Sequence, residues 1–372
     1  MRVLLTGGGT GGHLGPLLAL IEQIVVNPDP VQGPIDWQLM YIGSRQGMEV
    51  KIMPETGIRT AFIPSGKFRR YLSWRNLLSP FELLAGIWQA IRLIRSFRPQ
   101  VLFSTGGHVS VPVVLAARWC RIPIVIHEQT LVPGLANRLA ARYARRILLS
   151  YPQTVSHFER GKCVVTGNPV RTLILSGSRE KGRQLLELTE RLPVVLVMGG
   201  AQGAHFLNMQ VIGQLSAWLD VCQLILITGD NADHAAAQEA KKQLTPEERS
   251  RFRLFSYVTG ELGDLYAASD LVIARAGAGT IAELIALAKP SLLVPLPLSA
   301  KQEQQRNAEL LERNGGACVF YEAADQEQDL LSVSRLLISD REKIEAMALA
   351  LRSLQQEGAV EKIMHEINGV LS

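Results

Sequence analysis

The sequence predicts an α/β protein built from two doubly wound domains. Three observations carry this prediction. Short apolar segments alternate with helical patterns, each half of the chain has a strand that runs straight into a glycine-rich turn, and 372 residues exceed the ~100–200 typical of one domain. Apolar strands that alternate with helices are typical of parallel sheets covered on both faces. With 47% apolar and 20% charged residues, the composition excludes disordered, collagen-like and disulfide-scaffold classes.

The expected strands form two series. In the first half they are Val3–Thr6, Gln38–Ile42, Arg59–Ile63, Val101–Ser104, Ile124–His127 and Arg146–Ser150; in the second half they are Val194–Met198, Gln223–Thr228, Arg253–Tyr257, Leu271–Ala274, Ser291–Val294 and Ala317–Phe320. The turn-forming stretch Gly167-Asn168-Pro169-Val170-Arg171 marks the junction. We therefore expect two Rossmann-like domains facing across a cleft, over residues 1–168 and 169–372, and keep open that the last helix returns to the first domain.

Charge is distributed unevenly along the chain. The net charge is +5, yet residues 1–150 hold 17 Lys and Arg against 7 Asp and Glu, so the rest of the chain is acidic. A basic half favours nucleic acid, a membrane surface or a phosphorylated substrate as its partner. The four cysteines are far apart and indicate reduced thiols without a metal site. No apolar run approaches the ~20 residues of a membrane span and no signal peptide is evident, so we expect a cytoplasmic protein.

Two glycine-rich turns in the first half suit phosphate groups. Gly7 to His13 follows the first strand, where main-chain N–H groups at a helix start can stabilise an anion without a metal. The turn also matches the dinucleotide fingerprint; no carboxylate ends the second strand, which leaves open an NADP enzyme with Arg45 on the 2′-phosphate. Gly106-Gly107-His108 follows the fourth strand and should lie on the same sheet edge. Two adjacent anion-binding turns suit a diphosphate.

The second half repeats this arrangement between Ala274 and Glu283. Its small residues would admit a phosphate at the helix start. Glu283, one turn into the helix, could accept hydrogen bonds from ribose hydroxyls, or could simply be a favourable carboxylate at the positive end of the helix. By pattern alone, Gln304 belongs to a solvated helix start.

The stretch from Lys67 to Arg98 carries seven basic residues and one acidic residue. Its apolar residues recur at helical spacing: Leu77, Phe81, Leu84, Trp88 and Ile91. Two interpretations are open. The apolar face packs on the sheet, or it inserts partly into an anionic membrane, where each nearby basic residue adds about 1 kcal/mol. Arg138, Arg142, Arg145 and Arg146 either extend this basic surface or form a solvated helix face.

Taken together, the motifs resemble the MurG family, the UDP-N-acetylglucosamine transferases that complete the lipid-linked disaccharide-peptide of peptidoglycan and have the GT-B fold. The matching segments are Gly8–His13, Tyr41–Ser44, Ser65–Tyr71, Gly106–Pro112, His127–Gln129, Pro133–Arg138, Gly167–Arg171, Gly199–Ala204, Arg275–Thr280 and Gln304 to Ala308. They follow the family order over nearly the whole chain.

The resemblance implies that the C-terminal domain holds the donor, UDP-N-acetylglucosamine. The donor-binding residues that it implies are Thr10, Gly11, Gly12, Thr130, Arg171, Ala201, Val258, Ala278, Gly279, Thr280, Ile281, Ala282, Glu283 and Gln304. Among them, Glu283 would contact the ribose, Gln304 the transferred sugar and Val258 the uracil through its backbone. The chain departs from the family where Asn is frequent at Thr130 and Ser at Ala201, so Ala201 can offer only its backbone.

The acceptor implied by the resemblance is an undecaprenyl-diphosphate-linked muramyl peptide. Gly9, Gly106, Gly107 and His108 would hold its diphosphate. Its C4 hydroxyl would attack the anomeric carbon with inversion, which requires a general base and stabilisation of the leaving group. Helix N-termini can stabilise UDP, so neither metal nor cofactor is expected.

His13 is the preferred base, against a structural or phosphate-binding role. Glu128 is the second candidate, against a structural strand-end carboxylate.

The lipid-linked acceptor favours the membrane interpretation of the basic stretch. We expect a peripheral protein on the cytoplasmic face of the inner membrane. The membrane surface would comprise Lys67, Arg69, Arg70, Trp74, Arg75, Phe81 and Trp88.

Three other functions fit part of the pattern. A GT-B glycolipid synthase acting on diacylglycerol could share the architecture. An NADP oxidoreductase would leave the second domain unexplained. A nucleic-acid-binding module could use the basic half, but no such module is recognisable and aromatic residues make up only 6%, so no nucleic acid is expected.

Overall fold

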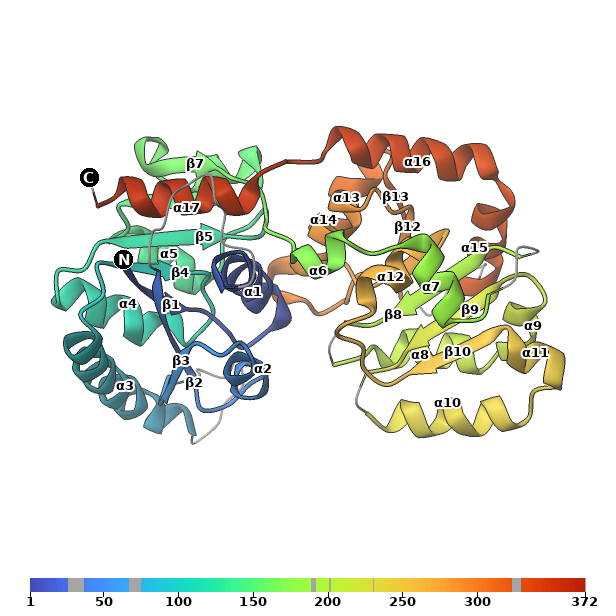
Figure 1. Ribbon diagram of the computed structural model, residues 1–372, viewed down its shortest axis with the longest axis horizontal. Coiled ribbons are helices and arrows are strands. Elements are labelled where there is room, and N and C mark those ends of the chain that lie inside the picture. Colours follow the sequence, from blue (N-terminus) through green and yellow to red (C-terminus); the bar gives the residue numbers. More distant parts are fainter. Residues whose placement is uncertain are drawn as a thin grey trace. The chain divides into compact units, whose positions relative to one another are not determined.

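The computed structural model divides into two α/β units (Figure 1). It describes residues 1–25, 37–66, 75–188, 192–200, 202–229, 231–322 and 329–371. The first unit comprises Met1–Arg171 together with Gln356–Ser372, and the second comprises Thr172–Gln355. The chain leaves the first unit after Arg171, rather than at residue 168, and its last segment belongs to the first unit.

A seven-stranded parallel sheet with the strand order β3-β2-β1-β4-β5-β6-β7 forms the centre of the first unit. The strands are β1 (Arg2–Thr6), β2 (Gln38–Ser44), β3 (Arg59–Ile63), β4 (Val101–Ser104), β5 (Ile124–Glu128), β6 (Arg146–Leu149) and β7 (Cys163–Val165). The helices are α1 (Gly11–Val25), α2 (Glu49–Glu55), α3 (Arg75–Phe97), α4 (Ser110–Trp119), α5 (Leu135–Ala141), η2 (Pro152–His157), η3 (Arg160–Lys162) and α17 (Ala359–Gly369). The order of strands reverses between β1 and β4, which is where open α/β sheets bind ligands.

Helices cover both faces of this sheet because side chains alternate along each strand. Val3 and Leu5 of β1 face α1 and α17, whereas Leu4 faces α3, α4 and α5. The last helix contributes Ile363 and Ile367, both fully buried, to the first of these cores. The continuous apolar strands seen in the sequence are thus explained by burial on both sides.

The second unit repeats the plan with a six-stranded parallel sheet in the order β10-β9-β8-β11-β12-β13. The strands are β8 (Val194–Met198), β9 (Gln223–Ile227), β10 (Phe252–Phe255), β11 (Leu271–Ala274), β12 (Ser291–Leu293) and β13 (Ala317–Val319). The helices are α6 (Thr172–Leu175), α7 (Arg179–Leu185), α8 (His205–Ile212), α9 (Leu215–Leu219), α10 (Ala232–Lys242), α11 (Pro246–Ser250), α12 (Leu262–Ala268), α13 (Ala278–Ala286), η4 (Ala300–Gln302), α14 (Glu303–Arg313), α15 (Leu330–Ser339) and α16 (Arg341–Ser353). The prediction of two doubly wound α/β domains is therefore confirmed, and each predicted strand coincides with an observed one apart from a few end residues.

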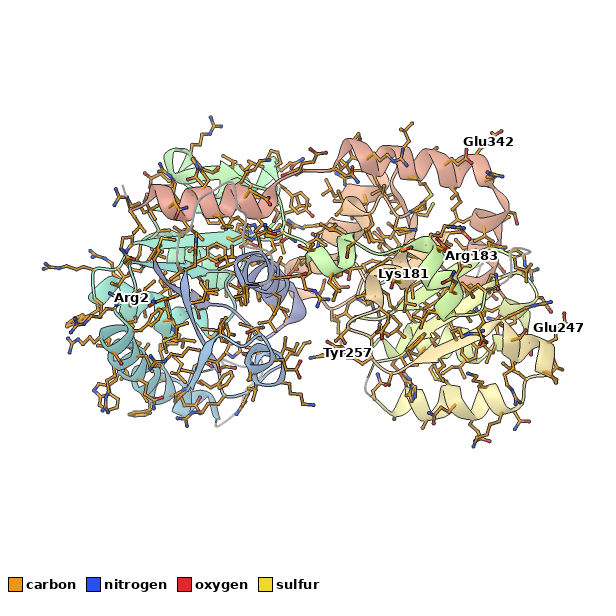
Figure 2. The ribbon with its side chains drawn as sticks, viewed as in Figure 1. Arg2, Lys181, Arg183, Glu247, Tyr257 and Glu342 are labelled. Carbon is orange, nitrogen blue, oxygen red and sulfur yellow. The ribbon has the colours of Figure 1, made fainter. Side chains whose placement is uncertain are left out.

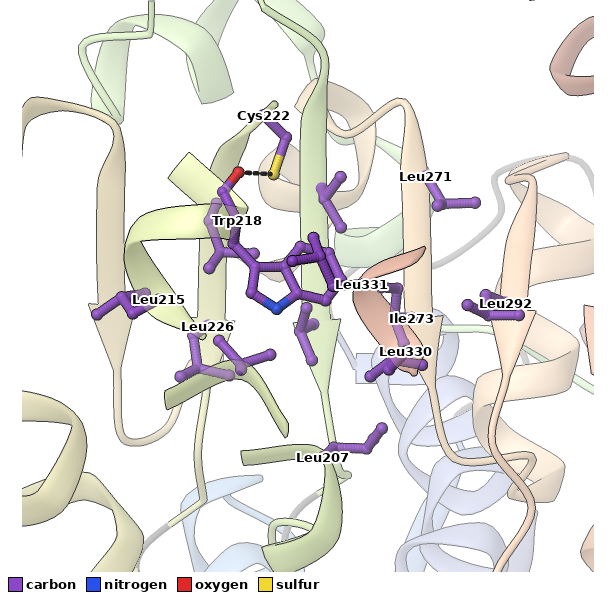
Figure 3. Close-up of a cluster of buried hydrophobic side chains, with 14 of the residues drawn as sticks. Leu207, Leu215, Trp218, Cys222, Leu226, Leu271, Ile273, Leu292, Leu330 and Leu331 are labelled. Atoms are coloured by element: carbon purple, nitrogen blue, oxygen red, sulfur yellow. Dashed lines mark hydrogen bonds between the residues drawn. The ribbon is translucent and has the colours of Figure 1, made fainter. Parts of the chain in front are cut away.

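Trp218 is central to the core of the second unit (Figure 3). The indole is fully buried among leucines that include Leu215, Leu226 and Leu330. The Cys222 thiol donates a hydrogen bond to the Trp218 carbonyl at 3.3 Å, which caps the short helix α9. Charged side chains such as Lys181, Glu247 and Glu342 lie on the outside of this unit (Figure 2).

Local capping explains where several helices of the second unit begin. Ser178 accepts a hydrogen bond from the Lys181 amide at the start of α7, and Asp329 accepts one from the Ser332 amide at the start of α15. Thr245 and Glu248 form a reciprocal capping box on α11. Each cap satisfies amides that lack a partner within the helix.

Shortening Ile363 to Ala should destabilise the first unit. A buried side chain that loses its methyl groups leaves a cavity, so we expect the free energy of unfolding to fall by about 2–5 kcal/mol. Urea denaturation measures this change. Val25→Ala, at the exposed end of α1, is the matched control and should stay within about 0.5 kcal/mol. Equal losses in both variants would contradict the placement of α17 in this core.

Candidate active site

The two glycine-rich turns of the first unit pack directly against each other. Strands β1 and β4 are paired with Thr6 opposite Ser104, so both turns leave the sheet side by side. The Gly8 amide donates to the Gly106 carbonyl at 3.3 Å. Gly107 has φ +83°, and a Cβ there would lie 2.1 Å from the Gly8 carbonyl oxygen. Only glycine fits this close approach, so packing alone already requires a glycine at that position.

A buried carboxylate holds the first glycine-rich turn through hydrogen bonds. Glu49, at the start of α2, is fully buried, and its Oε2 accepts a hydrogen bond from the Gly9 amide at 3.1 Å. Its Oε1 accepts one from the Ser44 hydroxyl at 2.7 Å. Burial and the neighbouring Glu49 charge raise the pKa of Tyr41, whose hydroxyl donates to the Gly7 carbonyl. The sequence pattern did not single out Glu49.

The Gly9 amide therefore donates to Glu49 and is not directed at an anion. The resemblance had implied that Gly9 helps to hold the acceptor diphosphate. At the start of α1, Gly11 and Gly12 precede the residues whose amides form the first hydrogen bonds of the helix. A Cβ on Gly11 would meet no atom within 4 Å. The ring of His108 lies against Gly9, about where a Cβ at that position would touch it.

His13 lies in the first turn of α1 and is half-buried. Its Nδ1 faces the Thr105 carbonyl oxygen at 2.9 Å and Gln129 Oε1 at 3.2 Å. The Thr105 hydroxyl in turn donates to the His13 carbonyl at 2.7 Å. The imidazole is thus fixed through one ring nitrogen to the ends of β4 and β5, which is the arrangement that a general base requires.

Glu128, the second candidate base, is saturated with hydrogen bonds. Its buried carboxylate accepts from the Thr130 amide and hydroxyl at 3.1 and 2.8 Å, from the Gly134 amide at 3.2 Å and from Asn137 Nδ2 at 2.9 Å. These four donors occupy the oxygens that a base would offer to a substrate. The geometry therefore favours the structural alternative, in which Glu128 holds the turn that follows β5. The Thr130 hydroxyl is part of this network instead of facing a ligand.

In the second unit, α13 begins at a glycine-rich turn. Unlike α7 and α15, it begins at Gly277 without a side-chain cap. A Cβ on Gly277 or Gly279 would meet no atom within 4 Å. Gly279 and Thr280 lie in the first turn of α13, where main-chain amides have no partner within the helix. The side chains of Ile281 and Ala282 are buried, so these two residues can offer only their backbone to a ligand.

Glu283 and Gln304 are both fixed by neighbours. Glu283 Oε2 accepts a hydrogen bond from the buried Tyr266 hydroxyl at 2.8 Å, which orients the carboxylate one turn into α13. Gln304 Oε1 accepts one from the Leu296 amide at 3.0 Å, which leaves its amide nitrogen as a hydrogen-bond donor. Asn307, buried on α14, donates to the Ala276 carbonyl at 3.1 Å and so ties the two helices together. Tyr266 had no recognisable signal in the sequence.

Three further donor-binding residues are implied by the resemblance. Arg171 and Val258 are partly exposed in their own units, and Ala201 lies outside the described residues. Arg275, just before α13, is almost buried and forms an ion pair with Glu322.

Three apolar residues of α3 face solvent. Phe81, Leu84 and Trp88 are 71%, 64% and 58% exposed, whereas Ala90 and Ile94 face the core. The interpretation that this face packs on the sheet therefore holds for Ile91 but not for Phe81, Leu84 or Trp88. Arg75 begins α3, whereas Lys67, Arg69, Arg70 and Trp74 lie outside the described residues.

Trp119, at the end of the neighbouring helix α4, is 73% exposed and was not singled out from the sequence. Within the described parts of the chain, no helix is long and apolar enough to cross a bilayer, and no group of three His, Cys, Asp or Glu is placed to hold a metal ion.

Comparison with known proteins identifies the family. Residues 3–149 match the glycosyltransferase family 28 N-terminal domain, and residues 194–365 match its C-terminal domain. A protein of Desulfitobacterium hafniense is 36% identical, with 98% of each chain covered. One of Clostridium botulinum is 38% identical, with 91% of this chain and 92% of the relative covered. Both are named UDP-N-acetylglucosamine–N-acetylmuramyl-(pentapeptide) pyrophosphoryl-undecaprenol N-acetylglucosamine transferase.

Among solved structures, the Acinetobacter baumannii MurG superimposes with a TM-score of 0.71, at 25% identity and with 99% of each chain covered. The chain belongs to the MurG family of glycosyltransferases. The resemblance stated from the sequence is thus confirmed. Membership of the MurG family leaves the NADP oxidoreductase and nucleic-acid alternatives without support.

Replacing Glu128 with Gln should cost stability. The carboxamide keeps one acceptor oxygen but turns an NH2 group toward the donors that the carboxylate binds, so we expect the free energy of unfolding to fall by about 3 kcal/mol. Thermal unfolding measures the loss. Glu159→Gln, an exposed partner of Lys162, is the control and should change it by under about 1 kcal/mol. A Glu128→Gln protein of unchanged stability that has lost turnover would instead restore Glu128 as a base.

Proposed function

We propose that this chain moves N-acetylglucosamine from UDP-N-acetylglucosamine to the C4 hydroxyl of an undecaprenyl-diphosphate-linked muramyl peptide, with inversion. Family membership supports this reaction, because relatives at 36–38% identity over almost their full length carry the name of such a transferase. The observation within the chain that carries the proposal is His13, held through Nδ1 in the first turn of α1 next to two glycine turns.

The donor side of the reaction uses the second unit. The uncapped start of α13 would bind the diphosphate of UDP with main-chain N–H groups, whose partial positive charge also stabilises the leaving group. Glu283, oriented by Tyr266, would accept hydrogen bonds from the ribose hydroxyls. Gln304 would donate from its amide nitrogen to the transferred sugar.

The acceptor side uses the first unit. The acceptor diphosphate would lie beside Gly106, Gly107 and His108, while the Gly11 and Gly12 amides at the start of α1 would approach the donor. His13 Nε2 would take the proton as the C4 oxygen bonds to the anomeric carbon. The bond from that carbon to the UDP oxygen breaks at the same time and its electron pair leaves with UDP; the proton on His13 then passes to solvent. A positioned base of this kind contributes about 10²–10⁴-fold to the rate.

We also propose that the chain associates peripherally with the cytoplasmic face of the membrane. The outer side of α3 presents Phe81, Leu84 and Trp88 to solvent, and Arg92 lies over the Trp88 ring at 4.7 Å. Exposed aromatic side chains flanked by arginines are typical of a membrane interface.

A basic hollow lies on the same unit. It has a volume of 720 Å³ at the amino ends of β5 and β6, and its charged lining residues are Arg118, Arg121, Arg142, Arg145 and Lys162. Among the described residues, Lys162 pairs with Glu159, and no carboxylate pairs with the four arginines. Unneutralised arginines beside the exposed Trp119 would attract anionic lipid headgroups, at about 1 kcal/mol for each residue close to the surface.

Removing the His13 imidazole should abolish most turnover. We expect His13→Ala to lower kcat by about 10²–10⁴-fold, measured as UDP release from UDP-N-acetylglucosamine in the presence of the lipid-linked muramyl acceptor. The melting temperature should change little, because the ring is only half-buried. His157→Ala, on the exposed η2, is the control. A folded His13→Ala protein with near-native turnover would remove His13 as the base.

Membrane association should depend on both the aromatic side chains and the lipid charge. In sedimentation with vesicles, the double substitution Phe81→Ser and Trp88→Ser should weaken binding at least about tenfold, since each side chain loses apolar contact with the bilayer. The control is Leu336→Ser, on an exposed position of α15. Binding to vesicles of neutral lipid should be weaker than to anionic ones and fall with salt. Equal binding to both would contradict the proposal.

A further inference from the structure

A continuous chain of hydrogen bonds lies behind His13. The Gly167 carbonyl oxygen contacts His127 Nε2 at 2.9 Å. Gln129 Nε2 contacts His127 Nδ1 and the His127 carbonyl oxygen, both at 3.0 Å. Gln129 Oε1 contacts His13 Nδ1 at 3.2 Å. His127 and Gln129 are both buried, so their polar atoms depend on these partners.

The chemistry of each group fixes the direction of the chain. A carbonyl oxygen only accepts, so His127 must carry its proton on Nε2, toward Gly167. Burial lowers the pKa of His127 to about 4, so the ring is neutral at physiological pH and its Nδ1 is an acceptor. The Gln129 NH2 group therefore points at His127. The His127 carbonyl enforces the same orientation independently, because it too can only accept.

The orientation of Gln129 determines the tautomer of His13. With its NH2 group turned to His127, Gln129 presents an oxygen to His13 Nδ1, and the second neighbour of that nitrogen is the Thr105 carbonyl oxygen. Two acceptors facing one ring nitrogen require a proton on it. The lone pair of the neutral ring is then on Nε2.

We propose that Gln129 is a positioning residue which, together with the Thr105 carbonyl, holds His13 as the Nδ1–H tautomer and so keeps Nε2 ready to accept a proton. This proposal rests on the base function proposed for His13. When Nε2 takes the proton of the attacking hydroxyl, the two carbonyl oxygens at Nδ1–H stabilise the resulting imidazolium. The neutral Gln129 amide thus fixes the tautomer of the imidazole and stabilises its protonated form, as the Asp carboxylate does in a Ser-His-Asp triad.

The buried carboxylates of this region are bound to other groups and do not orient His13 in place of Gln129. Glu128 is turned into its own network of four donors, and Glu49 is bound to Gly9 and Ser44. The ring of His108 lies against Gly9. Among the described residues, the two groups that hydrogen-bond to His13 Nδ1 are uncharged amide oxygens, one from the Thr105 main chain and one from the Gln129 side chain.

The test combines kinetics with the protonation of the ring nitrogens. Gln129→Leu should lower kcat about tenfold, equivalent to about 1.4 kcal/mol, with KM for UDP-N-acetylglucosamine unchanged. Gln129→Glu should move the acidic limb of the pH–rate profile upward by about one unit, because a carboxylate beside Nδ1–H favours the imidazolium. Gln153→Leu, an exposed glutamine on η2, is the matched control and should resemble the unmodified protein. Melting temperatures monitor folding of each variant.

Nitrogen NMR of histidine-labelled protein gives a readout that does not depend on turnover. His13 signals are assigned by their loss in His13→Ala. In the unmodified protein, Nδ1 should be protonated and Nε2 not; in Gln129→Leu the two tautomers should be mixed. A protonated Nε2 in the unmodified protein overturns the proposal, as does a folded Gln129→Leu protein with unchanged kcat and tautomer. If His13→Ala keeps its turnover, His13 is not the base and Gln129 has no catalytic role. Observation of the Nδ1–H tautomer would in that case still support the hydrogen-bond chain from Gly167 to His13.

Discussion

The close approach of the Gly107 backbone to the Gly8 carbonyl sets the geometry of the first unit's site. It can form only where residue 107 has no side chain, and it joins the turns after β1 and β4 into one surface. Thr105 therefore lies within hydrogen-bond distance of His13. The distances around the imidazole thus follow from strand register and the absence of a Cβ at residue 107.

Two buried carboxylates support this surface through hydrogen bonds. Glu49 holds the Gly9 amide, and Glu128 holds the turn that follows β5 through four donors. A buried carboxylate is tolerated only when its oxygens are hydrogen-bonded. Because each is bound to backbone amides as well as to side chains, each fixes the course of a loop. The two hydrogen-bonded carboxylates therefore hold the loops that carry the exposed residues of the site.

Much of the fold was readable from the sequence, because doubly buried strands are continuous apolar runs and the turns between them carry glycine. The glycine turns and the start of α13 were located for the same reason. Side-chain networks were harder to foresee. Tyr266 reaches Glu283 from another helix, and Glu49 reaches Gly9 across forty positions. The rotation of α3 was also unpredictable, since apolar spacing reports one face of a helix without saying whether protein or lipid covers it.

The path of the chain has a consequence for its synthesis. Residues 1–171 form most of the first unit, but Ile363 and Ile367 of α17 complete one of its two cores. Domains near the N-terminus generally fold first as a chain leaves the ribosome. Here α17 follows the second unit in sequence, so the first unit's apolar surface over α1 stays uncovered while the whole second unit is made. The second unit can therefore be completed before the first, although the first unit begins earlier in the sequence.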